Sequence, residues 1–311
     1  MGKSESFSEN ESEKKGKLKV KRSLLVRIRE EYPHLSKSHK KVADYILENY
    51  EKAAFYTAAR LGEVTGISVS TVVRFATQMG YPGYPEFQDA LRETIKGKLT
   101  SQQRMEVASQ QFRDSGSILD TMLHKDTHMI KETLDQVSRE DFEKAAEAIN
   151  NAHAIYIVGV RSSAPLASFM NFYLRMVYDN VRVITSNSSS EMLEEIFHIK
   201  KGDVCIAISF PRYSTQVAKA MNYVREKGGE IIAITDNERS PIARVSDYNL
   251  VAKSSMASYI DSLVAPLSLI NALILSASVK KQGDVFEIFD ELERIWGEYG
   301  VYENLEDEKN R

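Results

Sequence analysis

Residues 58–76 read AARLGEVTGISVSTVVRFA, two helical segments joined by a Gly-Ile-Ser turn. Gly66 can take the left-handed backbone that ends many helices, and Ile67 can then enter the core. Ser68 can accept hydrogen bonds from the first amides of the following helix. That helix is predicted over residues 69–79, because Gly80 and Pro82 would stop it. The pattern predicts a helix-turn-helix.

The second of these helices has two contrasting faces. Its apolar face consists of Val72, Phe75, Ala76 and Met79. The opposite face is short and polar, and Arg74 on it can reach a phosphate or a guanine edge in a major groove. Hydroxyl groups near the helix start can hold phosphates, helped by the positive end of the helix. The predicted DNA contacts are Ser68, Ser70, Thr71, Arg74, Thr77 and Gln78.

Charge is divided unevenly along the 311 residues, whose formal net charge is −3. Residues 1–100 contain 18 Lys and Arg against 13 Asp and Glu, and the remainder contains 23 against 31. A basic N-terminal part followed by an acidic remainder indicates that the N-terminal part binds a polyanion. The alternative is an ordinary amphipathic helix pair with a hydrated polar face. The basic N-terminal part and the Gly-Ile-Ser turn favour the interpretation that this helix pair binds double-stranded DNA.

The composition is that of an ordinary globular protein, with 42% hydrophobic and 27% charged residues. A single cysteine, Cys205, excludes a disulfide framework and fits a reducing compartment. The chain opens without an apolar signal segment, and the apolar stretch near residues 263–279 is interrupted by Pro266 and several polar residues. This stretch predicts a buried helix rather than a membrane span. We therefore expect a cytoplasmic protein.

Four segments are predicted along the chain. Residues 1–22 are polar and expected to be disordered, and residues 23–96 form the helix-turn-helix domain. Residues 97–117 are rich in Gln and Ser and predict a partly helical linker. Residues 118–311 form a second domain.

In that second domain the sequence pattern changes from helical spacing to strand-like segments that alternate with helical ones. Short apolar runs at residues 154–160, 181–185, 204–209, 231–235 and 248–252 are separated by amphipathic segments such as 165–178 and 215–227. Alternation of this kind predicts an α/β domain with an open, doubly wound parallel sheet, joined to an all-α N-terminal domain.

Two loops of the second domain carry groups that suit an anion. Residues 159–163 (GVRSS) follow the first predicted strand and residues 209–215 (SFPRYST) follow the third, each opening a helix. Helix-start amides, hydroxyls and arginines can hold a phosphate, and ligands bind at the carboxyl ends of parallel strands. One such loop is most often only a helix cap, but two on neighbouring strands indicate a site. Its predicted residues are Arg161, Ser162, Ser163, Ser209, Arg212, Ser214 and Thr215.

Longer patterns resemble two known families. Residues 68–87 read Ser-x-Ser-Thr-Val-Val-Arg-Phe-x-x-x-x-Gly-Tyr-Pro-Gly-Tyr-x-x-Phe, and with residues 35–47 they resemble the N-terminal domain of RpiR-type regulators. The order of strands and loops over about residues 130–280 resembles the SIS (sugar isomerase) domain, which those regulators carry after their helix-turn-helix.

The resemblance implies roles for particular residues. It implies that Ser163, Ser209 and Ser214 contact a phosphate. Ser240 with Pro241 is expected to cap a structural helix. In the loop after the helix-turn-helix, packing rather than base stacking is expected for Tyr81, Tyr84 and Phe87.

The two loops depart from the usual SIS pattern. Arg161 stands where the first loop commonly has its second glycine, and Pro211 with Arg212 replaces a Ser-Gly pair in the second. Guanidinium groups hold carboxylate or phosphate bidentately, so we expect a more anionic ligand than a simple hexose phosphate. The alternative is that both arginines form structural ion pairs or line an interface.

An enzyme of this fold would need an acid–base group beside its substrate. Glu191 follows a Ser-rich run and is retained as a ligand contact, whereas His124 and His128 predict a surface pair rather than a metal site.

A sugar-phosphate isomerase with an accessory helical domain is the alternative. We predict instead a transcriptional regulator of carbohydrate metabolism genes, with no catalytic residue, cofactor, metal or membrane partner. It is expected to bind palindromic DNA as a homodimer or tetramer, under control of a small anionic effector of the sugar-phosphate class.

Overall fold

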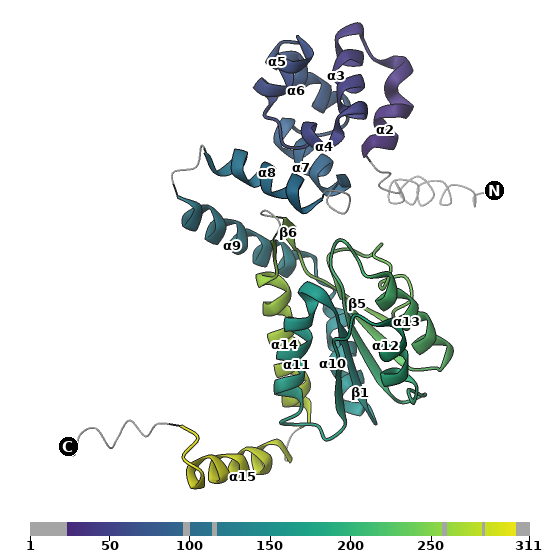
Figure 1. Cartoon of the computed structure of the whole chain (residues 1–311), viewed down its shortest axis with the longest axis vertical. Helices are drawn as coiled ribbons and strands as arrows, with labels where there is room; N and C mark the ends of the chain where they lie inside the picture. The colour runs from purple at the N-terminus through teal and green to yellow at the C-terminus, as the bar shows by residue number, and fades with distance from the viewer. Residues whose placement is uncertain (1–23, 96–99, 114–116, 257–259, 282–283, 303–311) are drawn as a thin grey trace, which may run out of the picture. The chain divides into compact units, whose positions relative to one another are not determined.

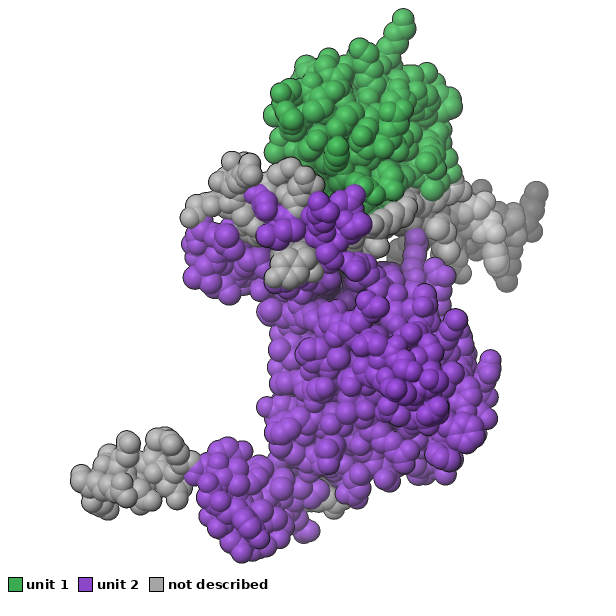
Figure 2. Space-filling model, viewed as in Figure 1, with its two compact units in different colours: residues 1–99 green, residues 100–311 purple. Residues whose placement is uncertain are grey.

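The computed structural model describes residues 24–95, 100–113, 117–256, 260–281 and 284–302. The chain divides into two compact units, residues 1–99 and 100–311 (Figure 2). The tail predicted to be disordered, residues 1–22, lies outside the described residues. No single helix in the described part of the chain is long and apolar enough to cross a membrane.

The described elements of the first unit are all helices, joined by short turns. α5 and α6 are the two predicted helices of the helix-turn-helix, and α3 and α7 pack against α6. The elements are α2 (Leu24–Glu31), η1 (Tyr32–His34), α3 (Lys37–Glu48), α4 (Tyr50–Ala53), α5 (Ala58–Thr65), α6 (Val69–Gln78) and α7 (Tyr84–Ile95).

Aromatic side chains fill the core of this unit. Phe75 of α6 and Phe87 of α7 are fully buried, and their rings pack edge to face with centroids 5.7 Å apart. The rings of Tyr81 and Tyr84 lie 5.6 and 6.0 Å from the ring of Phe87. Such pairs add to the burial energy of the rings. The packing role predicted for these three residues is therefore the one the structure shows.

The second unit is built on a five-stranded, all-parallel sheet in the order β2-β1-β3-β4-β5. Every residue of β1 and β3 is buried, as expected for central strands covered on both faces. The predicted fold class is confirmed, and each strand lies within two residues of its prediction. The strands are β1 (Ile155–Gly159), β2 (Val181–Ile184), β3 (Val204–Ile208), β4 (Glu230–Thr235) and β5 (Tyr248–Val251).

Helices cover both faces of the sheet (Figure 1). One face packs against α10 (Arg139–Asn151), α11 (Ala164–Leu174) and α14 (Val264–Lys280), with Ile157 and Ile206 pointing into that layer. The other packs against α12 (Ser189–Ile196) and α13 (Thr215–Glu226), with Val158 and Ala207 pointing into it. Two apolar cores therefore fix the positions of the loops at the strand ends.

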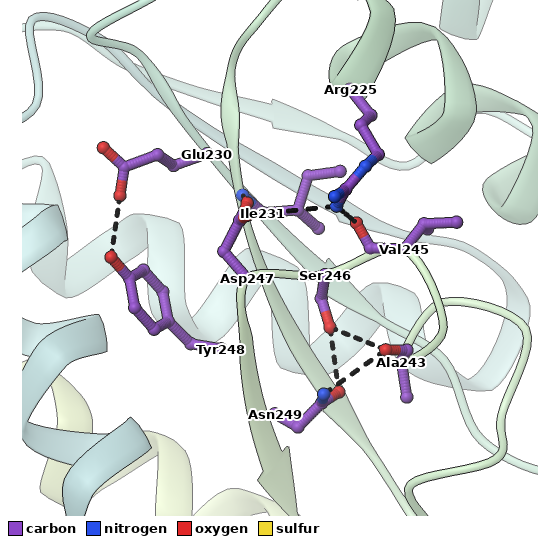
Figure 3. Close-up of polar contacts among 9 residues, drawn as sticks. All are labelled: Arg225, Glu230, Ile231, Ala243, Val245, Ser246, Asp247, Tyr248 and Asn249. Carbon is purple, nitrogen blue, oxygen red and sulfur yellow. Dashed lines mark hydrogen bonds and ion pairs between the residues drawn. The ribbon is translucent and has the colours of Figure 1, made fainter.

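A network of polar contacts holds the edge strand β5 beside β4 (Figure 3). The Tyr248 hydroxyl donates to a Glu230 carboxylate oxygen at 3.0 Å, and the Ile231 amide donates to Asp247 Oδ2 at 2.8 Å. Arg225 of α13 donates to the Val245 carbonyl at 2.7 Å. These contacts lie at the amino end of the strands, opposite the end where the predicted ligand loops lie.

Two further helices precede this sheet in the chain, α8 (Ser101–Arg113) and α9 (Ile118–Gln136). The Arg104 side chain of α8 is only 2% exposed, and its Nη2 lies 2.7 Å from Asp261 Oδ1. Asp261 belongs to a short hairpin, β6 (Ser255–Met256) with β7 (Asp261–Ser262). The Ser262 hydroxyl in turn donates to Asp126 Oδ1 of α9 at 2.6 Å. The stretch predicted as a linker thus contains a helix anchored to the second unit.

Two predictions of detail are wrong. Ser240 and Pro241 do not begin a helix: the Ser240 hydroxyl accepts from the Ala243 amide at 3.2 Å, but residues 241–245 form only turns. The apolar helix near residues 263–279 exists as α14, yet Leu275 and Val279 on it are 65% and 59% exposed. α14 is therefore buried on its inner side only.

Candidate functional site

The N-terminal end of α6 is a cluster of hydroxyl groups. Gly66 ends α5 with φ of 66°, and Ser68 caps α6 by accepting from the Thr71 amide at 3.3 Å, as predicted. The Ser68 hydroxyl also lies 3.1 Å from that of Ser70 and 2.8 Å from that of Thr71. Three hydroxyls thus gather at the positive end of a helix, an arrangement suited to a phosphate oxygen.

The outward face of α6 carries the other predicted DNA contacts. Arg74 is exposed. The Thr77 hydroxyl donates to the Val73 carbonyl at 3.2 Å within the helix, and Gln78 Oε1 lies 2.6 Å from His39 Nδ1 of α3. All six predicted residues therefore lie at the N-terminal end of α6 or along one side of it. Thr77 and Gln78 already have hydrogen-bond partners within the domain. His39 also belongs to this surface, and the sequence pattern did not identify it.

The two predicted ligand loops follow β1 and β3, which are neighbours in the sheet. From β1 the chain crosses to β2 on one side, and from β3 it continues to β4 and β5 on the other. The carboxyl ends of β1 and β3 therefore flank the point where strand order reverses, and ligands bind at such points in open parallel sheets. The prediction that both loops lie at one place in the fold agrees with this topology.

The first loop is held close to its strand. Residues 161–163 form one 3-10 turn, η2 (Arg161–Ser163), that leads into α11. A Cβ atom at Gly159 would lie 2.8 Å from the Ser163 carbonyl oxygen, so only glycine allows this approach. Ser163 is buried at 4% exposure, whereas Arg161 and Ser162 are exposed.

The second loop has a similar division between buried and exposed residues. Ser209 is 5% exposed, and Ser214 caps α13 by accepting from the Val217 amide at 3.5 Å. Thr215 begins α13, and Arg212 between the two serines is exposed. Ser163 and Ser209 are therefore buried and Ser214 is half-buried, while Arg161 and Arg212 are exposed in the same two loops.

Arg161 and Arg212 share a backbone conformation that is costly for both. Their φ angles are 54° and 64°, and they are the only non-glycine residues with positive φ among those the structure describes. Left-handed backbone costs an ordinary L-residue about 1–2 kcal/mol, and glycine avoids this cost. The resemblance to the SIS domain implies glycine at both positions. The chain thus keeps arginine where glycine would be less strained.

Further polar residues border the second loop. The Tyr213 hydroxyl donates to Asp236 Oδ1 at 2.6 Å and accepts from Asn237 Nδ2 at 2.8 Å. Asp236 directly follows β4 and is 4% exposed. An acidic residue directly after a buried strand was the signal that could have identified this group.

α8 also reaches the second loop. Arg212 Nη1 donates to the Ser101 hydroxyl at 3.3 Å, across a separation of 111 positions in the chain. Ser101 is the first residue of α8, and the buried Arg104–Asp261 pair lies one turn further along the same helix. Sequence reasoning did not find Ser101, because nothing in its local pattern distinguishes it from other polar residues near it.

Glu191 lies in the first turn of α12, after β2. It is exposed, and the Ser186 hydroxyl donates to its carboxylate. Burial, followed by the charge of Glu191, raises the pKa of the neighbouring Glu195 above its usual range. Because β2 pairs in parallel with β1, Glu191 follows a strand end at the same edge of the sheet as the arginine loops.

Two surface hollows lie away from these loops. One of about 260 Å³ is lined by α10 and the amino ends of β3, β4 and β5, including Glu230 and Tyr248. The other, of about 340 Å³, is lined by Leu193 and Glu194 of α12, by Phe197 directly after that helix, and by Tyr223 of α13. Ligands of open parallel sheets bind at the carboxyl ends of strands, so we do not assign the effector to either hollow.

Comparison with known proteins identifies the family to which the chain belongs. Residues 22–98 match the family model of the helix-turn-helix domain, rpiR family, and residues 148–276 match that of the SIS domain. The chain belongs to the RpiR family. It is therefore an HTH-type transcriptional regulator, and the resemblance stated from the sequence is confirmed for both domains.

Relatives of this RpiR-family regulator match it over most of their own length. An HTH-type transcriptional regulator of Caldanaerobacter subterraneus is 25% identical over 276 residues, which are 88% of this chain and 96% of that protein. One of Escherichia coli is 26% identical over 213 residues, 68% of this chain and 74% of that protein. These relatives are regulators rather than enzymes, as predicted for this chain.

Two solved structures share the fold. The sugar isomerase domain of an RpiR transcription factor from Sphaerobacter thermophilus matches with a TM-score of 0.54 at 26% identity, covering 57% of this chain and 98% of that one. The NanR protein of Vibrio vulnificus, complexed with ManNAc-6P, matches with a TM-score of 0.54 at 23% identity. That match covers 90% of this chain and all of the other.

Proposed function

We propose that this RpiR-family regulator changes its affinity for DNA when a phosphorylated sugar, or a related small anion, binds at the loops after β1 and β3. The observation that carries the proposal is the pair of left-handed arginines on adjacent strand ends. Residues with backbone strain of this kind cluster at active sites and ligand-binding sites. Two guanidinium groups beside helix-start serines are suited to hold a phosphate and one further acidic group.

Each predicted effector residue has a role in this site. Arg161 and Arg212 form charge-assisted hydrogen bonds to the anion, while Ser162, Ser163, Ser209, Ser214 and Thr215 supply hydroxyls and backbone amides. Glu191 accepts from a sugar hydroxyl. The complex of NanR with ManNAc-6P supports the sugar-phosphate class and supplies the first compound to test.

The DNA side of the proposal rests on α6. The hydroxyls of Ser68, Ser70 and Thr71 hold phosphates, Arg74 reaches a base edge or phosphate, and Thr77 and Gln78 complete the contact surface. The regulator acts in the cytoplasm, as a homodimer or tetramer on palindromic sites near genes of carbohydrate metabolism. A symmetric dimer needs two half-sites centred about one DNA turn apart or a multiple of it.

Thermal unfolding of the full chain tests the effector class. The probes are ManNAc-6P, other hexose and pentose phosphates, and sugar acids, each compared with inorganic phosphate and with the unphosphorylated sugar. A ligand that binds only the folded protein raises its stability by about 2.7 kcal/mol at one hundred times its Kd. At least one phosphorylated compound is expected to raise the melting temperature, and its unphosphorylated form is not. No rise with any anion would contradict the proposal.

A further inference from the structure

Gln78 is the last residue of α6, and its side chain is held by α3. Its amide oxygen lies 2.6 Å from His39 Nδ1. An amide oxygen only accepts hydrogen bonds, so the imidazole Nδ1–H donates and Gln78 accepts. Gln78 is exposed, and in the described part of the chain its NH2 group has no hydrogen-bond partner. The contact with His39 therefore leaves two N–H donors of Gln78 open to a partner outside the domain.

His39 is itself fixed by the fold. Its backbone amide donates to the hydroxyl of Ser36, the residue that caps α3, at 3.2 Å. Its ring packs edge to face on Phe75, with centroids 5.7 Å apart and ring planes at 76°. Phe75 is fully buried in the core of the unit. A buried phenyl ring, a half-buried imidazole and an exposed amide thus form one continuous series of contacts from the core to the surface.

This support changes what Gln78 can do at an interface. A glutamine side chain has three rotatable bonds, and immobilising such a side chain on binding costs conformational entropy. The bond to His39 already restricts those rotations in the folded protein. Ordering before binding strengthens an interaction, because less freedom is lost when the partner arrives. An exposed side chain that the fold orders without burying it is therefore suited to a binding contact.

The position of Gln78 on α6 indicates which part of DNA it contacts. In a helix-turn-helix the N-terminal residues of the second helix contact base edges. Gln78 lies at the opposite end of that helix. Glutamine side chains are among the groups that donate to phosphate oxygens, and such contacts fix the register and orientation of a protein on the duplex. The open N–H donors of Gln78 therefore fit a backbone phosphate.

The charges around His39 suit the same partner. Residues 37–41 read KSHKK, so three lysines and no acidic residue surround His39 in the sequence. Lys37 and Lys41 are exposed, and Lys40 Nζ lies 5.4 Å from the centre of the Tyr32 ring. A basic segment of this kind attracts a polyanion independently of its sequence.

We propose that His39 is a positioning residue for DNA binding: it holds the amide of Gln78 so that the NH2 group donates to a phosphate of the DNA backbone. This rests on the DNA contacts of α6 in the proposed function. It adds a residue from outside the helix-turn-helix and identifies the kind of contact that Gln78 makes. It does not depend on the effector.

A double-mutant cycle on the full chain tests this role. The Kd is measured by fluorescence anisotropy at fixed salt, on a duplex selected from a random library with the parent protein. Gln78→Ala is expected to weaken binding about fivefold, as for the loss of one hydrogen bond. His39→Phe keeps an aromatic ring against Phe75 but removes the donor, and it is expected to weaken binding about threefold. The double variant is expected to bind no more weakly than Gln78→Ala, because His39 acts only through Gln78.

Two further variants separate positioning from a general structural effect. The amide nitrogen of asparagine is as many bonds from the backbone as imidazole Nδ1, so His39→Asn keeps a donor and is expected to retain more affinity than His39→Phe. His34→Phe makes the same change at an exposed histidine of η1 and is expected to bind DNA like the parent. Thermal unfolding is expected to give His39→Phe and the parent protein similar melting temperatures.

The outcomes distinguish this inference from the proposed function. An unchanged Kd in Gln78→Ala would remove Gln78 from the proposed DNA surface, and the role of His39 with it. A loss in Gln78→Ala with none in His39→Phe, or losses that add in the double variant, would overturn the role of His39 alone. A phosphate contact weakens binding about equally on all duplexes. A changed base preference in His39→Phe would therefore overturn the assignment of Gln78 to a phosphate.

Discussion

Arg161 and Arg212 follow adjacent parallel strands and both have left-handed backbone, with φ of 54° and 64°. Glycine is the residue that this backbone favours. The two arginines therefore reduce the stability of the domain, and a gain in function has to offset that loss. Stability and effector binding should respond in opposite directions when either arginine is replaced by glycine.

The first prediction concerns Arg212→Gly. Relief of the left-handed strain should leave the free energy of unfolding unchanged or raise it by up to about 1 kcal/mol, since the more flexible unfolded chain offsets part of the gain. Loss of the charge-assisted bonds should weaken effector binding about tenfold or more. Denaturant unfolding and calorimetry measure the two quantities. The control is Lys219→Gly on α13, which should lower stability by about 1 kcal/mol and leave effector binding intact. Equal destabilisation by both substitutions would contradict the strain argument.

A second prediction concerns Arg74 on the outward face of α6. Arg74→Ala should weaken binding to the preferred DNA duplex by about 1–3 kcal/mol if the side chain reads a base edge. Lys52→Ala removes the same charge from α4 in the same unit and should have a smaller effect. Fluorescence anisotropy at fixed salt, on a duplex selected from a random library, measures both. Equal losses in the two variants would show that Arg74 contributes only general charge.

The buried ion pair between Arg104 and Asp261 gives a third prediction. Arg104→Met removes one partner and leaves the carboxylate, 11% exposed, without its guanidinium. Breaking a buried pair in this way costs about 3–5 kcal/mol. Replacing both residues, Arg104→Met with Asp261→Asn, should cost less than the single change. Urea unfolding of the two variants makes the comparison, and a single variant as stable as the parent would show that α8 is not anchored there.

A fourth prediction follows from Tyr178. Its hydroxyl donates to the Ala277 carbonyl of α14 at 3.0 Å, and burial raises its pKa from 10.0 to about 12. The folded state therefore favours the neutral phenol. Its contribution to stability is complete below pH 10 and is lost as the pH rises from about 10 through about 12. Tyr178→Phe should lower stability at neutral pH by about 1 kcal/mol and lose less stability over that alkaline range. Chemical unfolding at several pH values tests this, and parallel curves for both proteins would contradict it.

Much of the architecture was predictable because its signals are local. The turn between α5 and α6 needs only Gly66 and Ser68 in sequence, and the central strands are continuous apolar runs that no surface helix would contain. Family patterns then indicated which loops are predicted to contact a ligand. The helix expected at Ser240 and Pro241 failed because a hydroxyl cap can also close a single turn.

Contacts between segments far apart in the chain could not be predicted from local sequence patterns. The Ser101–Arg212 contact and the Arg104–Asp261 pair join residues more than one hundred positions apart, and nothing near Ser101 or Arg104 in sequence signals them. The left-handed backbone at Arg161 and Arg212 was also hidden, because arginine is not a residue that predicts it. α14 was expected to be buried because composition does not reveal which side of a helix the chain itself covers.

The most direct test of the account is a DNA-binding titration with and without effector. The parent protein and Arg212→Gly are titrated onto the same selected duplex, in the presence of ManNAc-6P or whichever phosphorylated sugar raises the melting temperature. We expect the compound to change the DNA affinity of the parent protein at least about fivefold, the lower range of allosteric coupling. Arg212→Gly should bind the duplex like the parent but respond little at the same effector concentration. A parent protein whose DNA affinity no anion changes, or a variant that responds equally well, would contradict the account.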